Sequence, residues 1–307
     1  MRRVAVEAYV LIRSSMNILL TGGSGDLGQL AIPALERLGH STTNLDLRPP
    51  VGEEGSKVGR FIEGSILDRK LLSTITPEVD CVIHIAALHG IHQARGDGDK
   101  QKFWDINVTG TYNVLQAAVE AHIGRVVFIS STSATDPGSS WYGHTKHIAE
   151  ETCKTFTVMH PELSIIRLRP RAFIPHWNHD VYESFTEWAQ WFWGGAVHID
   201  DVNQAVIKSV ELLASNPVPG CPMFIIDGKH DYSSEDMANW DRGGRGTTFK
   251  KYYGEAYHEL AVRHGLDPSR KPAVLDSTEA RRVLGYEPAY CLGNLLEELR
   301  QRDGLNR

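Results

Sequence analysis

Tyr142 and Lys146 are the residues whose types and spacing could most directly do chemistry, in the stretch "WYGHTKHIAE". They stand four residues apart at the beginning of an expected helix, so both side chains point the same way. A tyrosine hydroxyl ordinarily loses its proton near pH 10, and a neighbouring ammonium group stabilises the phenolate. Tyr142 could therefore take a proton from a substrate hydroxyl, or return one in the reverse direction.

The strand expected before this pair ends in a run of hydroxyl side chains, in "FISSTSA" at residues 128–134. Such hydroxyls can hold the oxygen of a substrate in front of the tyrosine. A tyrosine and a lysine at this spacing, taken alone, more often lie on a solvated helix face. The catalytic interpretation therefore depends on the elements around the pair, and above all on a cofactor site.

Three glycines at intervals of three residues indicate that cofactor site, in "LLTGGSGDLGQL" at residues 19–30. An apolar strand followed by this glycine pattern and a helix is typical of a dinucleotide-binding turn. Gly22 would permit the tight turn, Gly25 would let the backbone approach a pyrophosphate, and Gly28 would let helix and strand pack closely. The free N–H groups and the dipole at the start of the helix would hold the phosphates.

Asp46 ends the next expected strand, in "TNLDLR", and adds a second part to this pattern. A carboxylate at that place can accept hydrogen bonds from both ribose hydroxyls of adenosine and would repel a 2′-phosphate. The sequence therefore predicts NAD as the cofactor, while Arg48 nearby could favour NADP.

Short apolar runs alternate with helical stretches through the first 170 residues. Several runs are apolar at successive positions, as strands covered on both faces must be. Strands are expected at 17–21, 41–45, 60–64, 81–87, 125–131 and 163–169, and helices at 26–39, 105–124 and 142–160. This alternation predicts an α/β fold with a Rossmann-like doubly wound parallel sheet. The pattern loosens after Pro170, which predicts a smaller, irregular C-terminal lobe.

The chain of 307 residues is expected to divide unevenly. We expect a disordered N-terminal extension at 1–15, an NAD-binding domain at 16–170, and a lobe at 171–307 whose residues 196–228 return to the sheet. The net charge of −6 and the absence of a basic stripe argue against a nucleic-acid partner. No apolar stretch approaches the roughly 20 residues that cross a bilayer. The four cysteines form no C-x-x-C pair, so we expect a reduced, cytoplasmic protein.

On these motifs the chain resembles the extended short-chain dehydrogenase/reductases, specifically their NAD-dependent epimerase/dehydratase branch. The motifs span residues 16 to about 298 and read "TGGSGDLG", "VIHIAAL", "NVTGTYNVL", "FISST", "YGHTK", "VHIDDV" and "DSTEARRVLGYEP". The resemblance implies a Rossmann sheet, tightly held NAD and a C-terminal substrate lobe. It implies an NAD-dependent oxidoreductase or epimerase that moves a hydride between NAD and a carbinol of a small, sugar-like substrate.

The resemblance also implies roles for single residues. Thr132 takes the place of the catalytic serine or threonine, Tyr142 that of the acid/base, and Lys146 that of the ribose-binding, phenolate-stabilising lysine. Cofactor contacts are implied for Gly22, Gly25, Asp26, Leu27, Gly28, Asp46, Ser65, Ile66, Ala86, Ala87, Asn107, Ser130, Tyr142, Lys146 and Pro170. Substrate contacts are expected from His89, Thr132 and Arg171.

The sequence also departs from the family pattern. Ser65 replaces a usual aspartate before Ile66, and only nine residues separate the catalytic threonine and tyrosine positions. Ala172 and Gly194 stand where nucleotide-sugar enzymes commonly place an asparagine and an arginine that contact the diphosphate. We therefore expect a substrate that is not a nucleotide-diphospho-sugar. A nucleotide-sugar 4-epimerase or dehydratase is the alternative, and a non-catalytic NAD-binding regulator is a further one.

Three other features have plainer interpretations. The neighbouring histidines lack an acidic or cysteine partner at zinc spacing, so we expect no metal; they are His84, His89, His92, His176 and His179. Tryptophans at 177, 188, 191 and 193 could stack on a sugar ring, but aromatics at helical spacing are more typical of a core. The segment 241–254, "DRGGRGTTFKKYYG", is expected to be a mobile surface loop. The partners expected are a small-molecule substrate and a second copy of the chain in a homodimer.

Overall fold

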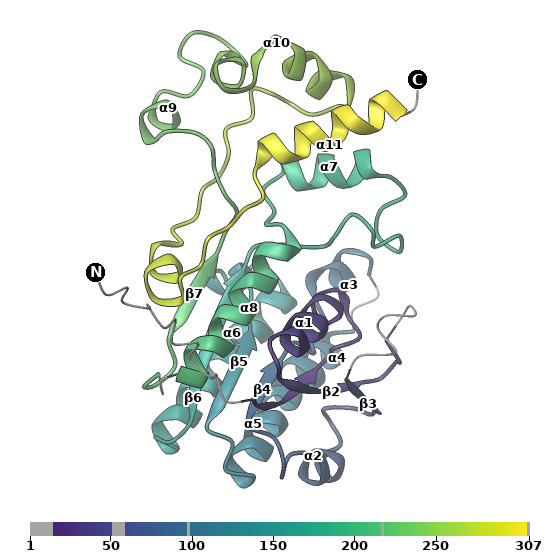
Figure 1. Ribbon diagram of the computed structural model, residues 1–307, viewed down its shortest axis with the longest axis vertical. Coiled ribbons are helices and arrows are strands. Elements are labelled where there is room, and N and C mark those ends of the chain that lie inside the picture. The colour runs from purple at the N-terminus through teal and green to yellow at the C-terminus, as the bar shows by residue number, and fades with distance from the viewer. Residues whose placement is uncertain (1–14, 51–58, 97–98, 216–217, 306–307) are drawn as a thin grey trace, which may run out of the picture.

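A single sheet of parallel strands forms the centre of the molecule in the computed structural model (Figure 1). The structure describes residues 15–50, 59–96, 99–215 and 218–305, so the expectation for residues 1–14 lies outside the described residues. The strands are β1 (Asn17–Thr21), β2 (Ser41–Asp46), β3 (Arg60–Glu63), β4 (Cys81–His84), β5 (Arg125–Ile129), β6 (Ser164–Pro170) and β7 (Met223–Ile226). Their order is β3-β2-β1-β4-β5-β6-β7, which confirms the predicted doubly wound sheet.

Successive apolar residues in the strands serve two separate cores. In β1, Ile18 and Leu20 point into the core on one face, and Leu19 points into the core on the other. Because side chains alternate across a strand, a strand covered on both faces must be apolar at every position. This is why the strands lack the alternation of a half-exposed sheet.

Helices cover both faces of the sheet (Figure 1). α1 (Asp26–Arg37) and α8 (Ile199–Ser215) pack against each other on one face. The other face is covered by α2 (Arg69–Ile75), α5 (Gly110–Glu120) and α6 (Trp141–Met159). The short helices α3 (Gly90–Ala94) and α4 (Lys100–Trp104) follow β4.

Two expected elements differ from the structure. The run 81–87 is a strand only as far as His84, because the chain then turns to contact Thr21 at the end of β1. The single helix expected at 105–124 begins as a π-helical turn, Asp105–Thr109, before α5. An inserted side chain explains the wider turn, since Asn107 is buried there and bonds to neighbouring segments.

The C-terminal lobe lies above the carboxyl ends of the strands and has a core of its own (Figure 1). It contains α7 (Phe185–Trp193), α9 (Ser234–Ala238), α10 (Thr247–Arg263) and α11 (Leu292–Leu305). A π-helical turn, Ala280–Leu284, packs back against the sheet core. Trp188 is fully buried in the lobe core and Trp191 and Trp193 pack against it, as expected, whereas Trp177 is exposed.

The segment 241–254 is not the surface loop that the sequence predicted, because α10 begins within it at Thr247. Gly246 adopts a left-handed conformation that turns the chain into the helix, and Phe249 anchors the first turn by complete burial. Glycine-rich composition misled the prediction here, since its glycines lie before the helix and at a kink at Gly254.

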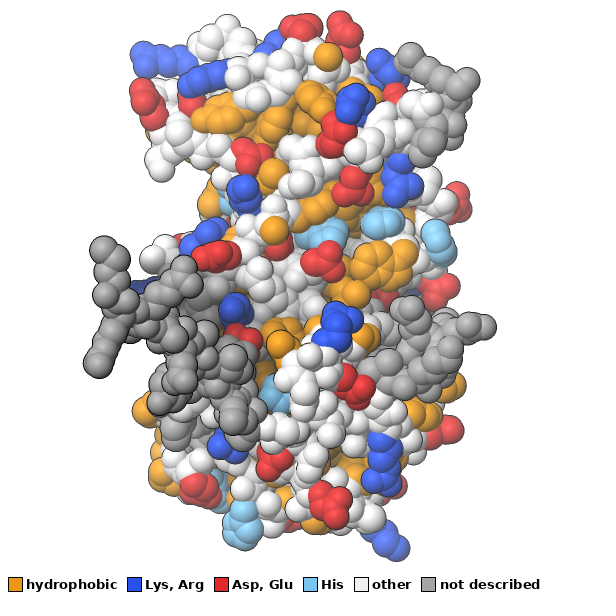
Figure 2. Space-filling model, in the orientation of Figure 1, with side chains coloured by type: hydrophobic (Ala, Val, Ile, Leu, Met, Phe, Trp, Pro, Cys, Tyr) orange, Lys and Arg blue, Asp and Glu red, His pale blue; other side chains and the backbone are white. Residues whose placement is uncertain are grey.

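A waist separates the lobe from the sheet, and Figure 2 shows histidine and apolar side chains exposed together along it. The segment Ile199–Ser215 and β7 return the chain from the lobe to the sheet. The chain runs from β1 outward to β3 and then crosses to β4 on the other side of β1. In such sheets ligands bind beyond the carboxyl ends of the strands at this switch point.

Candidate active site

The glycine turn lies at the switch point, between the carboxyl ends of β1 and β4. Gly22 has a φ of 74°, and a Cβ there would lie 2.7 Å from the Cα of Ala86. No other residue fits both the backbone conformation and the space. The structure thereby brings the glycine turn against Ala86, which follows β4.

Gly28 has no room for a side chain, because it lies against the backbone of the glycine turn. A Cβ at Gly28 would lie 2.4 Å from the Cα of Gly23, and one at Gly23 would lie 2.5 Å from Oδ1 of Asn44. The start of α1 is therefore pressed against the turn itself. Gly23 was not singled out from the sequence, although its place between Gly22 and Gly25 was the available signal.

Gly25 differs from its neighbours, since a Cβ there would meet only the carbonyl oxygen of Gly22, at an ordinary 3.4 Å. The side of the turn that Gly25 faces is therefore open. The first N–H groups of α1, from Asp26 to Gly28, have no partner within the helix. The turn has the form of a cradle for an anion, which fits a pyrophosphate.

The Asp46 carboxylate lies beside this cradle at the end of β2. It accepts hydrogen bonds from the N–H of Ser24 at 3.0 Å and from the N–H of Arg48 at 3.2 Å. Ser24 in turn donates its hydroxyl to the carbonyl of Arg48 at 2.7 Å. These bonds fix the carboxylate next to the turn, where the sequence predicted a ribose-binding group.

Ile66 and Asn107 brace the loops on the two sides of the site. Ile66 is buried against Gly110, where a Cβ would lie 2.4 Å from its Cδ1. Asn107 accepts the N–H of Leu88 at 2.8 Å and donates to the Leu88 carbonyl at 2.9 Å and to Thr145 Oγ1 at 3.0 Å. Asn107 thus ties the loop after β4 to α6.

Tyr142 lies in the first turn of α6, which Ser140 caps by accepting the N–H of Gly143 at 2.9 Å. The N–H of Tyr142 donates to Gln93 Oε1 at 3.1 Å, and the ring lies 3.3 Å from the Cβ position of Gly90. Helix α3 therefore covers the tyrosine. Burial raises the pKa of Tyr142, and a hydrogen bond with Ser131 lowers that pKa by less.

The hydroxyl that meets Tyr142 is that of Ser131, one residue before the Thr132 singled out from the sequence. Ser131 also caps the 3₁₀ turn Thr132–Thr135 by accepting the N–H of Ser133 at 3.1 Å. Both hydroxyls follow β5 directly, and Thr132 stays the position that the resemblance predicts for the catalytic hydroxyl.

Lys146 lies one helical turn after Tyr142, and its side chain is buried. Its Nζ donates to the carbonyl oxygen of Ile129 at 2.5 Å and lies 4.6 Å from the centre of the Phe128 ring. Burial lowers the pKa of Lys146 to about 8, while Cys153 and Glu150 act in the opposite direction. The ammonium is therefore available at neutral pH beside the start of α6.

His84 is a buried residue whose two ring nitrogens both contact threonine hydroxyls. Its Nδ1 lies 2.6 Å from Thr21 Oγ1, and its Nε2 lies 3.0 Å from Thr111 Oγ1. Burial, and then the charge of Lys146, lower the pKa of His84 to about 3, so the ring is neutral. Among the described residues there is no group of three or more histidine, cysteine or acidic side chains that could hold a metal ion.

Two residues expected to contact substrate differ in whether their side chains are already engaged by other residues. His89 is exposed on the loop beside Tyr142, with its ring 4.7 Å from that of His92. Arg171 instead lies 3.4 Å from Asp227 Oδ1 and donates to the carbonyl of Ala273. Its guanidinium is thus held at the junction of the lobe and the sheet.

Three residues expected to contact the cofactor have their side chains turned elsewhere. Leu27 is buried in the sheet core, so only its backbone faces the turn. Pro170 is buried at the end of β6, opposite Ile226. Ser130 donates its hydroxyl to Glu150 at 2.5 Å.

An arginine from another segment borders Gly194, where the sequence lacks one. Arg270 Nη2 donates to the Gly194 carbonyl at 3.0 Å, and its Nη1 lies 3.7 Å from the Cβ position of Gly194. The adjacent Gly195 has no room for a Cβ, which would lie 2.2 Å from Arg171 Nη2. The two glycines therefore leave space that two guanidinium groups occupy.

A segment of the lobe crosses from the glycine turn to α3. Asn178 Nδ2 donates to Asp26 Oδ2 at 2.8 Å, and Arg95 donates to the carbonyl of Asp180. Burial raises the pKa of Asp26, the Asn178 hydrogen bond lowers it, and Asp180 raises it. This contact was not foreseen, because it joins residues more than 150 positions apart.

Comparisons with known proteins point in the same direction. A family model described as "NAD dependent epimerase/dehydratase family" matches residues 18–180. The protein y4nG of Sinorhizobium fredii is 25% identical over 317 residues, which cover 91% of this chain and 76% of that protein. A UDP-glucose 4-epimerase of Neisseria meningitidis is 29% identical over 180 residues, which cover 50% of this chain and 51% of the epimerase.

Solved structures share the fold. UDP-glucose 4-epimerase from Brucella ovis in complex with NAD has a TM-score of 0.68 at 19% identity, covering 92% of this chain and 96% of that one. MoeE5 in complex with UDP-glucose and NAD has a TM-score of 0.66 at 22% identity, covering 94% and 99%. No helix among the described residues is long and apolar enough to cross a membrane.

Proposed function

The chain belongs to the NAD dependent epimerase/dehydratase family, and from that premise we propose that it moves a hydride between NAD and a carbinol of a sugar-like substrate. The observation that carries the proposal is the juxtaposition at the switch point. Tyr142, the Ser131 hydroxyl and the buried Lys146 ammonium lie beyond the same strand ends as the glycine turn.

The residues present fit NAD. The open side of the turn at Gly25 and the first N–H groups of α1 would hold the pyrophosphate, and Asp46 would hold the adenosine ribose. Ile66 and Ala86 would line the two ends of the cofactor, and Lys146 would bind the second ribose. When bound, NAD supplies the hydride acceptor and donor, and in its oxidised form a positive charge near Tyr142.

Tyr142 would exchange the proton of the substrate hydroxyl, with Ser131 and Thr132 orienting that oxygen. Burial raises the pKa of Tyr142 in the free chain, so the hydroxyl keeps its proton there. Losing it near neutral pH therefore requires positive charge close by. Lys146, whose pKa is about 8, provides that charge only below this pH in the free chain.

A nucleotide-sugar 4-epimerase or dehydratase is the second candidate. Arg270 beside Gly194 favours it, because this guanidinium could contact a phosphate where the expected arginine is absent. The names of the relatives agree with this candidate. Against it, Arg171 is occupied by Asp227 and Ala273.

The test begins with the purified protein, whose NAD content is measured after release by denaturation. Free sugars, uronic acids and UDP-sugars are then offered, and reduced nicotinamide is followed by absorbance. Tyr142→Phe should keep NAD affinity and stability, while turnover falls by roughly 10²–10⁴-fold, because only a positioned acid–base group is lost. Normal turnover in Tyr142→Phe would refute the mechanism.

The same panel separates the candidates. Turnover of UDP-sugars alone, with UDP affinity reduced in Arg270→Gln, would select the nucleotide-sugar enzyme. NAD binding without turnover of any compound, and with no effect of Tyr142→Phe on NAD affinity, would favour the non-catalytic regulator.

A further inference from the structure

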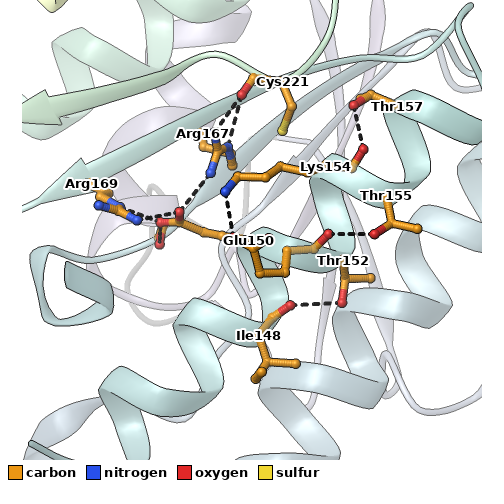
Figure 3. Close-up of polar contacts among 11 residues, drawn as sticks. Ile148, Glu150, Thr152, Lys154, Thr155, Thr157, Arg167, Arg169 and Cys221 are labelled. Atoms are coloured by element: carbon orange, nitrogen blue, oxygen red, sulfur yellow. Dashed lines mark hydrogen bonds and ion pairs between the residues drawn. The ribbon is translucent and has the colours of Figure 1, made fainter. Parts of the chain in front are cut away.

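A fully buried carboxylate lies on α6 one helical turn after Lys146. Glu150 accepts the hydroxyl of Ser130 at 2.5 Å, Arg167 Nη1 at 2.8 Å, and Arg169 Nε and Nη2 at 2.6 and 2.7 Å. Figure 3 shows both guanidinium groups pointing toward this carboxylate from the strand β6. The hydrogen bonds from these donors, chiefly those of Arg169 and Ser130, outweigh burial and lower the pKa of Glu150, so the carboxylate is charged.

Two side chains of α6 bind adjacent residues, 129 and 130, where the chain leaves β5. Lys146 Nζ binds the carbonyl of Ile129 at 2.5 Å, and Glu150 binds the hydroxyl of Ser130 at 2.5 Å. The next residue along the chain is Ser131, whose hydroxyl meets Tyr142. The distance between the tyrosine and that hydroxyl is therefore set by how α6 is fastened to the end of β5.

Glu150 is also the carboxylate that acts on the buried Lys146 ammonium. The titratable groups that act on Lys146 or are acted on by it are Glu150 and Cys153 on α6, His84 on β4 and His89 beyond it. Tyr142 lies one turn before Lys146 on the same helix, and Arg167 and Arg169 of β6 pair with Glu150. His84 is neutral, since its pKa is about 3. Burial raises the pKa of the Cys153 thiol, so this group is neutral too.

We propose that Glu150 is a positioning residue for the Tyr142–Lys146 pair, holding the β5 exit through Ser130 and serving as the counter-charge of the buried Lys146. This rests on the proposed function, in which Lys146 binds the cofactor ribose. The arginines then have a second role besides pairing. They hold the carboxylate against Ser130, and their excess positive charge limits how strongly Glu150 acts on Lys146.

The charge part of the proposal predicts a pH shift. Glu150 raises the pKa of Lys146, so Glu150→Gln should lower this pKa below about 8. NAD affinity, measured by calorimetry from about pH 6 to about pH 9.5, should fall with rising pH as Lys146 loses its proton. The midpoint of that fall should move to lower pH by about half a pH unit or more in Glu150→Gln.

Glu151→Gln is the matched control, because it makes the same chemical change on the adjacent, exposed residue that pairs with Lys154. It should leave the midpoint in place. Glu150→Asp should restore the native midpoint, since it keeps the charge. A purely structural Glu150 would lower the melting temperature of Glu150→Gln without moving the midpoint.

Glu150→Gln leaves two buried guanidinium groups unpaired and can fail to fold. Arg169→Gln provides a second test, because it keeps the Arg167–Glu150 pair and removes one positive charge. The midpoint should then move in the opposite direction, to higher pH. An unmoved midpoint in whichever of the two variants folds overturns the proposal, whereas absence of NAD binding by the native chain overturns the proposed function instead.

Discussion

The Asp46 carboxylate is the single group that should decide between the two nicotinamide dinucleotides. It is held beside the glycine turn by the N–H groups of Ser24 and Arg48. Asp46→Ala should weaken NAD by about tenfold or more, because hydrogen bonds to a charged group are lost, and should strengthen NADP relative to NAD. Calorimetric titration with both dinucleotides measures the ratio.

Glu63 offers a control for that change, since it is exposed and lies opposite Asp46 at the end of the adjacent strand. Glu63→Ala should leave the preference unchanged. Equal affinity of the native chain for NAD and NADP would contradict the assignment of Asp46.

Lys146 should make the free energy of unfolding depend on pH, besides contributing to cofactor binding. Its pKa is about 8 in the folded chain and ordinarily 10.5, so between these values the unfolded chain binds the proton and the folded chain does not. Stability from this group therefore rises with pH across that interval, by on the order of 3 kcal/mol. Lys146→Met should lack this rise and should lose NAD affinity.

Urea denaturation of the native chain and of Lys146→Met at pH 7, 8, 9 and 10 measures the difference between their free energies of unfolding. The free energy of unfolding of Lys146→Met, relative to that of the native chain, should be highest at pH 7, because the native chain then carries a desolvated ammonium. A difference independent of pH would mean that Lys146 titrates normally.

At the scale of elements, alanine substitutions at two glycines of one turn should have different effects on stability. A Cβ at Gly28 would strike the backbone of Gly23, so Gly28→Ala should lower stability by about 1–3 kcal/mol and abolish NAD binding. A Cβ at Gly25 meets no close atom, so Gly25→Ala should keep its stability and still lose NAD affinity, because the methyl group fills the cradle. Thermal unfolding and NAD titration of both variants test this.

Retention of NAD by Gly25→Ala would show that the cradle is not where the cofactor lies. Full stability of Gly28→Ala would contradict the packing against Gly23.

At the scale of the whole molecule, the lobe reaches across the waist to the cofactor turn. Asn178 bonds to Asp26 at 2.8 Å, and Arg95 of the α3 region bonds to Asp180. Asn178→Ala should increase the rate of NAD dissociation by about fivefold, since a net hydrogen bond is worth about 1 kcal/mol. Stopped-flow displacement of NAD measures the rate.

Asn239→Ala serves as its control, because Asn239 is an exposed lobe residue whose amide bonds to Glu235 and Arg242 in its own part of the chain. An unchanged dissociation rate in Asn178→Ala would mean that the lobe contact does not retain the cofactor.

The sequence by itself determined the sheet, and it predicted where the main parts of the candidate site lie on that sheet. Glycines at 22, 25 and 28, the carboxylate at 46 and the tyrosine–lysine pair act through local geometry, since each needs only a strand end or a helix start to be placed. Strands buried on both faces could be recognised for the same reason, because such burial requires consecutive apolar residues.

Only the tertiary structure decided which hydroxyl of "SST" meets Tyr142. It also decided that Glu150 contacts Ser130, that Asn178 contacts Asp26, and that Arg270 contacts Gly194. It also replaced the loop expected at 241–254 by the start of α10, because burial of Phe249 overrides a glycine-rich composition. Each of these depends on which segments meet in the fold. A local pattern carries no information about such a partner, as for Asn178 and Asp26, which are 152 positions apart. Burial then sets the charges, as for Lys146 with its pKa of about 8.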